Sequence, residues 1–475
     1  MPLTITEAAQ GLRAREFSSR ELLTEVTRYA DHFDPLVHAY SRRFDDTAHQ
    51  AGAAADQDFA SGIDRGALQG IPVGIKDIIF TREASTRAGS DVRNVAWEAP
   101  LDATVVARLR DAGAVITGKT TTAELAVGMP EADRLDRECR NPWDTARWAG
   151  GSSAGSSAGA VAGMFLAGIG TDTGGSIRLP AAYCGIVGLR PTFGLVSRAG
   201  TIPLSPSLDV VGPITRTARD AALVLQALAG PDPRDPSAVA RPVPDFSRDL
   251  GRPLQGLRVG AVRAHHSDAE DAMPELADRF DEAVGELQRA GAVVREIELP
   301  DYEAGVSAVL VTLFADASAY HASALREQWS AFGVSTRRAL ANGALLSAAD
   351  YVMAQKVRRA VRRLVSDLYR EVDVIICATA LADAPLLEAI DLQDLTAAIR
   401  TDYWSAVGNP VASVPIGFSD RGMPLGMQIA GRHFDDATVL RVADGYERLT
   451  GWHRRIPPTT ALLGQSAGVE GRDHA

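Results

Sequence analysis

Hydrophobic residues recur at helical spacing through the first sixty positions of the chain and then give way to short, continuous runs. Ser18 or Ser19 is placed to cap the amphipathic stretch RELLTEVTRYADHF, and a second such stretch, FDDTAHQAGAAADQDFA, follows it. From Gly70 onward, the β-branched run GIPVGIKDIIF, the helical pattern TVVARLRDAG and the run AVITGKT come in turn. This alternation of helices with short buried strands predicts an α/β fold.

The same alternation returns after a polar interruption. Pro and Asp cluster over residues 231–253, which predicts an exposed connection. Beyond it the runs LRVGAVR and AVVREIEL flank a predicted helix over residues 271–290. A helical region over residues 302–368 and the predicted strands VDVIICA and VASVPIGF complete the pattern.

Charge narrows the class of partner. The chain has 475 residues, 46% of them hydrophobic, and a formal net charge of −11. A chain of this length can bury a large core, but a negative charge opposes binding to nucleic acid or to an anionic membrane. We therefore expect a small-molecule partner and no binding to nucleic acid or to a membrane. Formation of a homodimer is compatible with the sequence.

Cysteine usage and targeting patterns indicate a cytoplasmic protein. The three cysteines, Cys139, Cys184 and Cys377, are few and widely spaced, as expected for reduced thiols. The N-terminus lacks the basic and apolar regions of a signal peptide. The most apolar run, residues 158–170, is shorter than the roughly 20 residues of a membrane helix and is predicted to be a buried element.

Two short motifs suggest functions that their context does not support. GAVITGKT (residues 113–120) matches the phosphate-binding P-loop, but its interior has the pattern of the strand itself rather than of a loop after a strand. GSSAG occurs twice and matches the G-x-S-x-G elbow of α/β-hydrolases with Ser153 or Ser157 as nucleophile. No strand pattern precedes it, and all nine histidines lie outside residues 50–264, so a histidine base would have to come from a distant segment.

Lys76, between two apolar runs, is the better candidate for a base. A buried amine loses basicity and can act as a neutral base, although most such lysines end a strand with the ammonium in water. The stretch GTDTGGSIR follows with glycines that permit close approach. Backbone N–H groups of Thr173, Gly174, Gly175 and Ser176 are placed to form an oxyanion hole.

With these residues in place, the sequence resembles the amidase signature family. The resemblance rests on GIPVGIKD, GGSSAGSSAGAVA, GTDTGGSIRLPAAYCGIVGLRPTFGLVSRAG, DVVGPITRT and the C-terminal GNPVASVPIGF and GMPLGMQIAGRHFDDATVLRVADGYE. It extends from about residue 5 to 457. The order and spacing of a lysine, a Gly-Gly-Ser-Ser and a Gly-Gly-Ser-Ile-Arg make these motifs highly specific.

The resemblance implies a role for each matching residue. Ser176 is the nucleophile, Ser152 bridges from a cis peptide bond, and Lys76 is the base. Asp172 and Arg178 are implied to hold the loop, and Ser153 is expected to be a structural hydrogen-bonding group. We expect no metal and no organic cofactor, because no cluster of ligands has zinc-like spacing.

The resemblance also implies one large α/β domain, a mixed twisted sheet covered by helices on both sides. The predicted domain spans residues 1–460. Its parts are an N-terminal helical part (1–60), a catalytic core (66–217), the exposed connection (231–253) and the remainder of the domain (254–460). Residues 461–475 are expected to fray.

Hydrolysis of a carboxylic amide through an acyl-enzyme on Ser176 is the predicted activity. Predicted pocket residues are Leu125, Met129, Phe314, Tyr403 and Trp404, which favour hydrophobic or aryl amides, with esters and carbamates as extensions. Glu131, Asp133 and Asp402 argue against this preference, because a carboxylate facing the pocket would select a cationic group. The alternatives are the glutamine-hydrolysing A-subunit of a tRNA-dependent amidotransferase and a P-loop nucleotide-binding protein, the latter also hinted at by the basic stretch KVRRAVRR.

Overall fold

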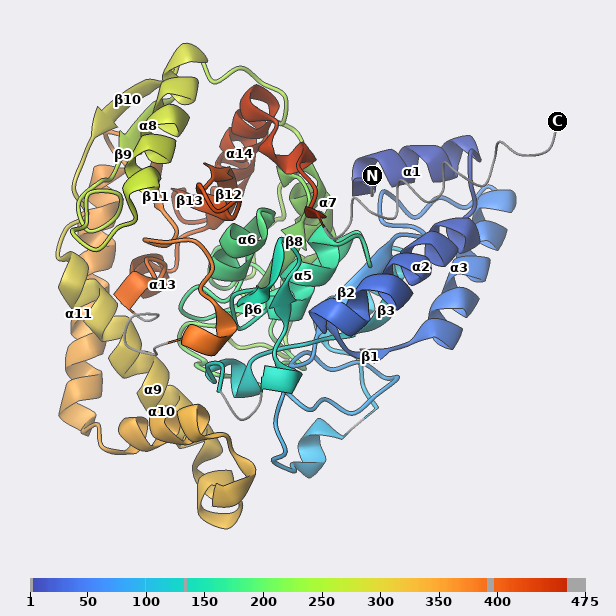
Figure 1. The fold of residues 1–475 in the computed structure, drawn as a ribbon, viewed down its shortest axis with the longest axis horizontal. Helices are drawn as coiled ribbons and strands as arrows, with labels where there is room; N and C mark the ends of the chain where they lie inside the picture. Colours follow the sequence, from blue (N-terminus) through green and yellow to red (C-terminus); the bar gives the residue numbers. More distant parts are fainter. Residues whose placement is uncertain (1–2, 99, 132–134, 391–396, 459–475) are drawn as a thin grey trace.

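An eleven-stranded mixed sheet runs through the computed structural model, which describes residues 3–98, 100–131, 135–390 and 397–458 (Figure 1). Its strands are β1 (Tyr40–Arg43), β2 (Pro72–Lys76), β3 (Val115–Thr120), β6 (Ala167–Asp172), β7 (Val187–Arg190), β8 (Val210–Thr215), β9 (Arg258–Ala261), β10 (Val293–Glu296), β11 (Val374–Ala378), β12 (Val411–Phe418) and β13 (Pro424–Ala430). They lie in the order β1-β3-β2-β6-β8-β7-β12-β13-β11-β9-β10. Pairing is parallel for β2 with β3 and β6 and for β9 with β10 and β11, and antiparallel elsewhere. A separate hairpin joins β4 (Arg140–Asn141) and β5 (Asp144–Trp148).

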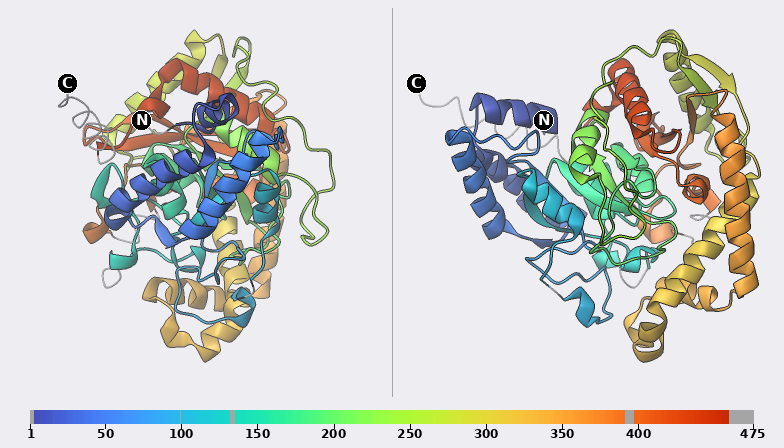
Figure 2. Two further views of the ribbon diagram at one scale, coloured as in Figure 1. Left: turned by 90° about the vertical axis from the view of Figure 1, so that its right-hand side faces the viewer. Right: turned by 180° about the vertical axis from the view of Figure 1, so that it is seen from behind.

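Helices cover the sheet and also form the two ends of the molecule. They are α1 (Ile5–Ala14), α2 (Ser19–Val37), α3 (Asp45–Ala60), α4 (Thr104–Asp111), α5 (Ala154–Val161), α6 (Arg178–Cys184), α7 (Ala218–Leu228), α8 (Pro274–Arg289), α9 (Tyr302–Glu327), α10 (Val334–Ala344), α11 (Ala348–Leu368), α13 (Asp402–Val407) and α14 (Asp436–Thr450). The N-terminal helices α1 to α3 lie at one end of the molecule, and α9 to α11 lie at the other (Figures 1 and 2).

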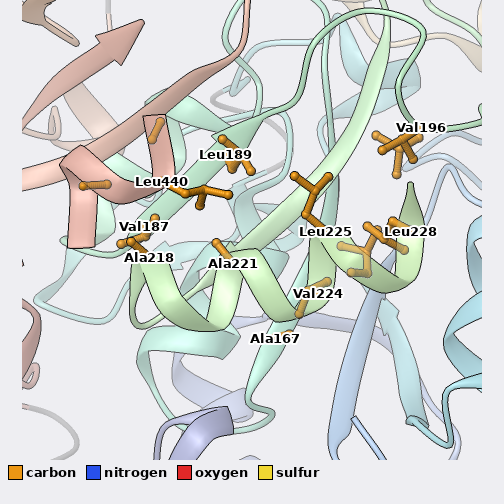
Figure 3. Close-up of a cluster of buried hydrophobic side chains, with 14 of the residues drawn as sticks. Ala167, Val187, Leu189, Val196, Ala218, Ala221, Val224, Leu225, Leu228 and Leu440 are labelled. Carbon is orange, nitrogen blue, oxygen red and sulfur yellow. The ribbon is translucent and has the colours of Figure 1, made fainter. Parts of the chain in front are cut away.

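Small and large residues alternate along the central strands, and this alternation determines which helices pack on each face of the sheet. A Cβ added to Gly168 of β6 would lie 2.5 Å from the carbonyl oxygen of Ser156, so glycine is needed there for the close approach of α5. Ala167 points to the opposite face, into a cluster with Leu225 of α7 and Leu440 of α14 (Figure 3). As a result α5 and α6 cover one face, and α7, α8 and α14 cover the other.

The predicted α/β domain, a mixed sheet with helices on both sides, is confirmed. Two local expectations differ. The strand β1 interrupts the N-terminal helical part, because Tyr40 pairs with Thr120 of β3 and packs its ring on Phe165; four residues are too few to give a periodic signal. Residues 158–170 are not one element but the end of α5, a turn and the start of β6. Residues 231–253 contain turns and irregular structure, and the predicted tail, 461–475, lies outside the described residues.

A long excursion between β10 and β11 consists mainly of α9, α10 and α11. Among the described helices, only α9 is long and apolar enough to cross a membrane, a test that core helices of soluble proteins also pass. Its apolar residues have other contacts here. They pack against α10, α11 and α13, and Leu313 and Phe314 line a cavity described below.

Candidate active site

Two neighbouring parallel strands end at the same edge of the sheet. Lys76 is the last residue of β2, and β6 pairs with β2 in parallel. Ser152 lies just before α5, and Ser176 lies in the loop between β6 and α6. The fold therefore brings Lys76, Ser152 and Ser176 together, and both serines line the same cavity.

Lys76 is fully buried and has two hydrogen-bond acceptors. Its Nζ donates to Ser152 Oγ at 2.7 Å and to Thr171 Oγ1 at 2.8 Å. Burial lowers the pKa of Lys76 to about 7, against the opposing charges of Asp172 and Asp209. A large fraction of this amine is therefore neutral near pH 7, as a general base requires.

The two serines that precede α5 have different surroundings. The peptide bond between Gly151 and Ser152 is cis, and the Ser152 hydroxyl faces both Lys76 and the cavity. Ser153 instead pairs with Thr171 of β6, donating from Oγ to the carbonyl oxygen at 3.1 Å and accepting from the amide at 3.3 Å. These are the contacts of a residue that fixes the loop to the sheet.

The loop from Thr173 to Ser176 exposes a row of backbone donors to the cavity. All four residues line the cavity, and their N–H groups have no hydrogen-bond acceptor among the residues that the structure describes. The Ser176 side chain is partly exposed there. Adjacent unused N–H groups beside a hydroxyl can stabilise an oxyanion that forms on an attacked carbonyl.

Glycine is needed twice in this loop because residues 401 and 402 pack directly against it. A Cβ on Gly174 would lie 2.5 Å from Asp402 Oδ1, and one on Gly175 would lie 1.9 Å from Thr401 Oγ1. Gly175 also has φ = +136°. The shape of the loop that carries Ser176 thus depends on the start of α13.

Gly175→Ala is expected to lower the free energy of unfolding by about 2–5 kcal/mol, because overpacking costs about 1–3 kcal/mol and a positive φ about 1–2 kcal/mol. Urea unfolding measures this loss. Gly66→Ala is the matched control, since Gly66 has φ = +112° but no atom within 4 Å of an added Cβ. Equal losses in the two variants would show that the contact with Thr401 is unimportant.

Asp172 and Arg178 form a buried network behind the loop. Arg178 donates from Nε and Nη2 to the two Asp172 oxygens, each at 2.9 Å, and Arg190 reaches Oδ1 at 2.9 Å. Burial alone would raise the pKa of Asp172, but the two guanidinium groups hold it well below its usual range. Arg178 also donates to the Thr401 carbonyl at 2.7 Å, which ties the loop to α13.

Sequence reasoning missed most of these supporting residues. Thr171 holds Lys76, Asp209 accepts from Thr173 Oγ1 at 2.6 Å, and Gln428 accepts from Arg178 Nη1 at 2.8 Å. Gln428 lies 250 positions from its partner. All three residues stand in stretches that carry the family resemblance, but no local pattern indicated which partner each would contact.

The cavity at the serines has a volume of about 570 Å³. Met129 and Phe314 line it, as predicted from the sequence. Leu125, Tyr403 and Trp404 do not belong to its described lining. Leu125 is 1% exposed in the main core, while Tyr403 donates to the Pro300 carbonyl and Trp404 to Cys377 Sγ from within the core behind α13. The expectation that these three side chains form the pocket wall is therefore corrected.

Polar residues that were not among the predicted pocket residues line the same cavity. Asp402, Arg400, Glu303 and His265 all belong to its lining. Burial raises the pKa of Asp402 to about 7. The carboxylate that argued against an apolar substrate therefore does face the cavity, and it is accompanied by a cation and a second acid.

The structure offers no support for the two short motifs. Lys119 of GAVITGKT is buried inside β3, where its Nζ donates to the Ile79 carbonyl and to Thr86 Oγ1. Ser157 is buried within α5. His265 reaches the cavity wall, where its ring stacks on Tyr302, and it has no hydrogen bond to a serine among the described residues.

This fold and site define an enzyme that acts on carbon–nitrogen amide bonds. A family model described as Amidase matches residues 21–440. The chain therefore belongs to the amidase family, the amidase signature enzymes, as the sequence motifs predicted.

Several relatives share nearly the whole chain. A protein of Methylococcus capsulatus (strain Bath), named as the A-subunit of Glutamyl-tRNA(Gln) amidotransferase, is 39% identical over 96% of this chain and 98% of its own. The solved structure of the same kind of A-subunit from Thermotoga maritima is 32% identical, covers 94% of each chain and has a TM-score of 0.77. A chain from an inhibitor-bound structure, described as a vestigial protein complex that reveals the evolutionary origins of an s-triazine catabolic enzyme, is 31% identical, with 94% and 99% coverage and a TM-score of 0.89.

These findings correct the predicted substrate preference. The prediction of a general amidase for hydrophobic or aryl amides is wrong, because curated relatives at 37–39% identity over nearly the full length are amidotransferase A-subunits. The physical reason lies in α13, which turns Tyr403 and Trp404 into the core and leaves Asp402 at the cavity.

The predicted partners are corrected as well. The prediction was a small-molecule amide as partner, with no nucleic acid and possible homodimer formation. It does not fit the relatives, because their names describe subunits of an amidotransferase that acts on a tRNA. Net charge of the whole chain was the basis for that prediction. The net charge of one chain does not exclude a complex that binds nucleic acid, because a neighbouring protein can carry the surface that complements the nucleic acid.

Proposed function

We propose that this chain is the glutamine-hydrolysing subunit of a tRNA-dependent amidotransferase and releases ammonia from the side-chain amide of glutamine. The observation that carries the proposal is the placement of Asp402 and Arg400 in the cavity that contains both serines. Glutamine carries an ammonium and a carboxylate next to its amide-bearing side chain. An acid and a base on one wall complement that pair of charges.

The proposed chemistry uses Lys76, Ser152 and Ser176 as a relay. Neutral Lys76 takes a proton from Ser152, which takes one from Ser176 as its oxygen attacks the amide carbon. The N–H groups of residues 173–176 stabilise the resulting oxyanion. The proton then returns through Ser152 to the leaving nitrogen, the C–N bond breaks, and ammonia departs. Water attacks the ester on Ser176 by the same relay and releases glutamate.

Further support comes from the surroundings of the relay. Lys76 contacts Ser152 at 2.7 Å and has a lowered pKa, which suits a base that works near neutral pH. The three cysteines are buried and free of disulfides, in keeping with the reducing cytoplasm. A partner protein would receive the ammonia and use it on the aminoacyl-tRNA, as the names of the relatives suggest.

Asp402→Asn is expected to raise KM for glutamine about 10- to 100-fold with a smaller change in kcat, since a charge-assisted hydrogen bond contributes about 1.5–3 kcal/mol. In the parent enzyme, KM should fall as the pH rises through about 7, where Asp402 ionises and can pair with the ammonium. The variant should lose this dependence. Steady-state release of ammonia from glutamine, measured with the chain alone and with co-purified partners, checks both results.

Glutamine turnover by the parent chain decides the proposal itself. Ammonia release from glutamine that is abolished by Ser176→Ala supports it. Turnover of neutral amides without turnover of glutamine, either alone or with partners, would contradict it. An unchanged KM in Asp402→Asn would leave glutaminase activity standing but remove Asp402 from substrate recognition.

A further inference from the structure

A second cavity lies at the C-terminal end of α11, away from the serines. Its volume is about 570 Å³, and it shares no lining residue with the cavity of the active site. We call it the α11 cavity. Three arginines line it, namely Arg362 and Arg370 from α11 and its C-terminal turn and Arg432 from the segment between β13 and α14. Arg362 belongs to the basic stretch KVRRAVRR, which the proposed function does not use.

The other lining residues are also hydrogen-bond donors. Ser366 lies four residues after Arg362 on the same face of α11, and Arg370 follows four residues later in the turn after the helix. Tyr369, Asn409 and His433 complete the described lining, which contains no carboxylate. Every residue of the α11 cavity therefore offers an N–H or O–H group.

Contacts with backbone carbonyls hold two of the arginines and His433 in place. Arg362 Nε donates to the Val407 carbonyl at 3.0 Å, and His433 Nε2 lies 2.7 Å from the same oxygen. Arg432 Nη2 donates to the carbonyl of Tyr369 at 2.6 Å. Since a guanidinium has five N–H donors, each arginine is fixed by one edge and retains donors for a ligand.

Two of these side chains converge on one point. A Cβ added to Gly408 would lie 3.5 Å from His433 Cε1 and 4.0 Å from Arg362 Nη2. Arg370 and Arg432 are paired with Asp367 at 3.2 Å and Asp373 at 3.4 Å. Within the described residues, Arg362 has no ion pair, so its charge is uncompensated in the folded chain.

Tyr369 provides an independent indication of a ligand. The side chain is 4% exposed, and its Oη faces the Asn409 side chain, another lining residue, without a hydrogen bond of good geometry. A buried hydroxyl without a partner costs about 1–3 kcal/mol, so such groups are rare unless a ligand or water satisfies them. Here the hydroxyl belongs to the lining of a cavity formed by cations.

We propose that the α11 cavity binds a small anion through a phosphate group. Its donors come from a helix face, from the residues that follow α13 and from the segment before α14, so they approach a ligand from several directions. A tetrahedral phosphate accepts hydrogen bonds from several directions, whereas a planar carboxylate is satisfied by the fork of one arginine. The volume leaves room for the rest of a phosphorylated metabolite. This site is independent of the proposed glutaminase activity.

Titration calorimetry with inorganic phosphate and pyrophosphate, at constant ionic strength, tests the proposal on the full chain. We expect saturable binding of one equivalent in the millimolar range or tighter. Arg362→Gln should weaken it at least tenfold. Tyr369→Phe removes one oxygen without altering the packing and should weaken it several-fold, which keeps the test valid if Arg362→Gln unfolds.

Arg363→Gln is the matched control, because Arg363 follows Arg362 on α11 and is exposed as Arg362 is, but does not line the cavity. Its affinity for phosphate should equal that of the parent chain. Equal weakening by the two arginine variants would indicate diffuse charge and would overturn the proposal, as would the absence of saturable binding. An RNA oligonucleotide of about ten residues that binds more tightly than pyrophosphate, and that depends on Arg363, would point to a nucleic-acid surface instead.

Discussion

Ser176→Ala is expected to reduce amide hydrolysis by about 10⁴-fold or more while the protein stays folded. The hydroxyl forms the covalent bond to the acyl group in the proposed mechanism, so no other group replaces it. It contributes little to the fold, because it is partly exposed and the Ser176 contact to Ser153 uses the backbone carbonyl. Steady-state ammonia release and thermal unfolding measure the two effects.

Ser157→Ala provides the control for this substitution. Ser157 is buried in α5, and its Oγ has no described hydrogen-bond partner, so the variant removes an equivalent hydroxyl close to the site without removing a contact. Its activity should match that of the parent enzyme. Intact mass spectrometry with a slow substrate should place the adduct on Ser176, and an adduct on Ser153 or Ser157 would contradict the assignment.

Lys76→Met is expected to lower kcat by several orders of magnitude, since it removes the only base that contacts Ser152 among the described residues. In the parent enzyme, kcat should rise with pH along a limb centred near 7, as Lys76 loses its proton. The variant should lose that limb. A pH series of kcat, with glutamine well above KM, separates this effect from the ionisation of Asp402.

Two further measurements accompany this prediction: the activity of His265→Ala and the stability of Lys76→Met as a function of pH. His265 is the histidine of the described cavity lining, and its loss should leave the pH limb of kcat in place. The pKa of Lys76 is about 7 in the folded chain and about 10.4 when unfolded, so the unfolded chain binds more protons between these values and stability rises with pH across that window. Lys76→Met should flatten this rise. Loss of activity in His265→Ala, with an active Lys76→Met, would reverse the roles.

The grouping of Lys76, Ser152 and Ser176 at one cavity was predictable because these residues occur in motifs whose spacing is itself informative. Lys76 ends a β-branched run, and Ser152 and Ser176 occur in glycine-rich stretches that only a loop can accommodate. The network that supports them was not predictable. Thr401 and Gln428 reach Arg178 from more than 220 positions away, through strand pairings that no local pattern specifies.

The prediction of the pocket-wall residues was incorrect for a different physical reason. Tyr403 and Trp404 were predicted as pocket residues from their apolar character, but α13, which carries them, has only six residues and therefore no readable periodicity. Its first residue, Asp402, faces the cavity, while Tyr403 and Trp404 enter the core. A shift of one residue in such a short helix exchanges the polar and aromatic faces, so composition alone favoured the wrong substrate class.

The excursion between β10 and β11 has an evolutionary consequence. Its helix α9 supplies much of the cavity wall, from Tyr302 to Phe314, whereas Lys76, Ser152 and Ser176 come from the other half of the chain. Mutations in α9 can therefore change the compound that is accepted without disturbing the three residues of the proposed relay. Descendants of one ancestor can diverge in this segment while they keep one scaffold, which suits a fold shared by a tRNA amidotransferase subunit and by a complex described through the origins of an s-triazine catabolic enzyme.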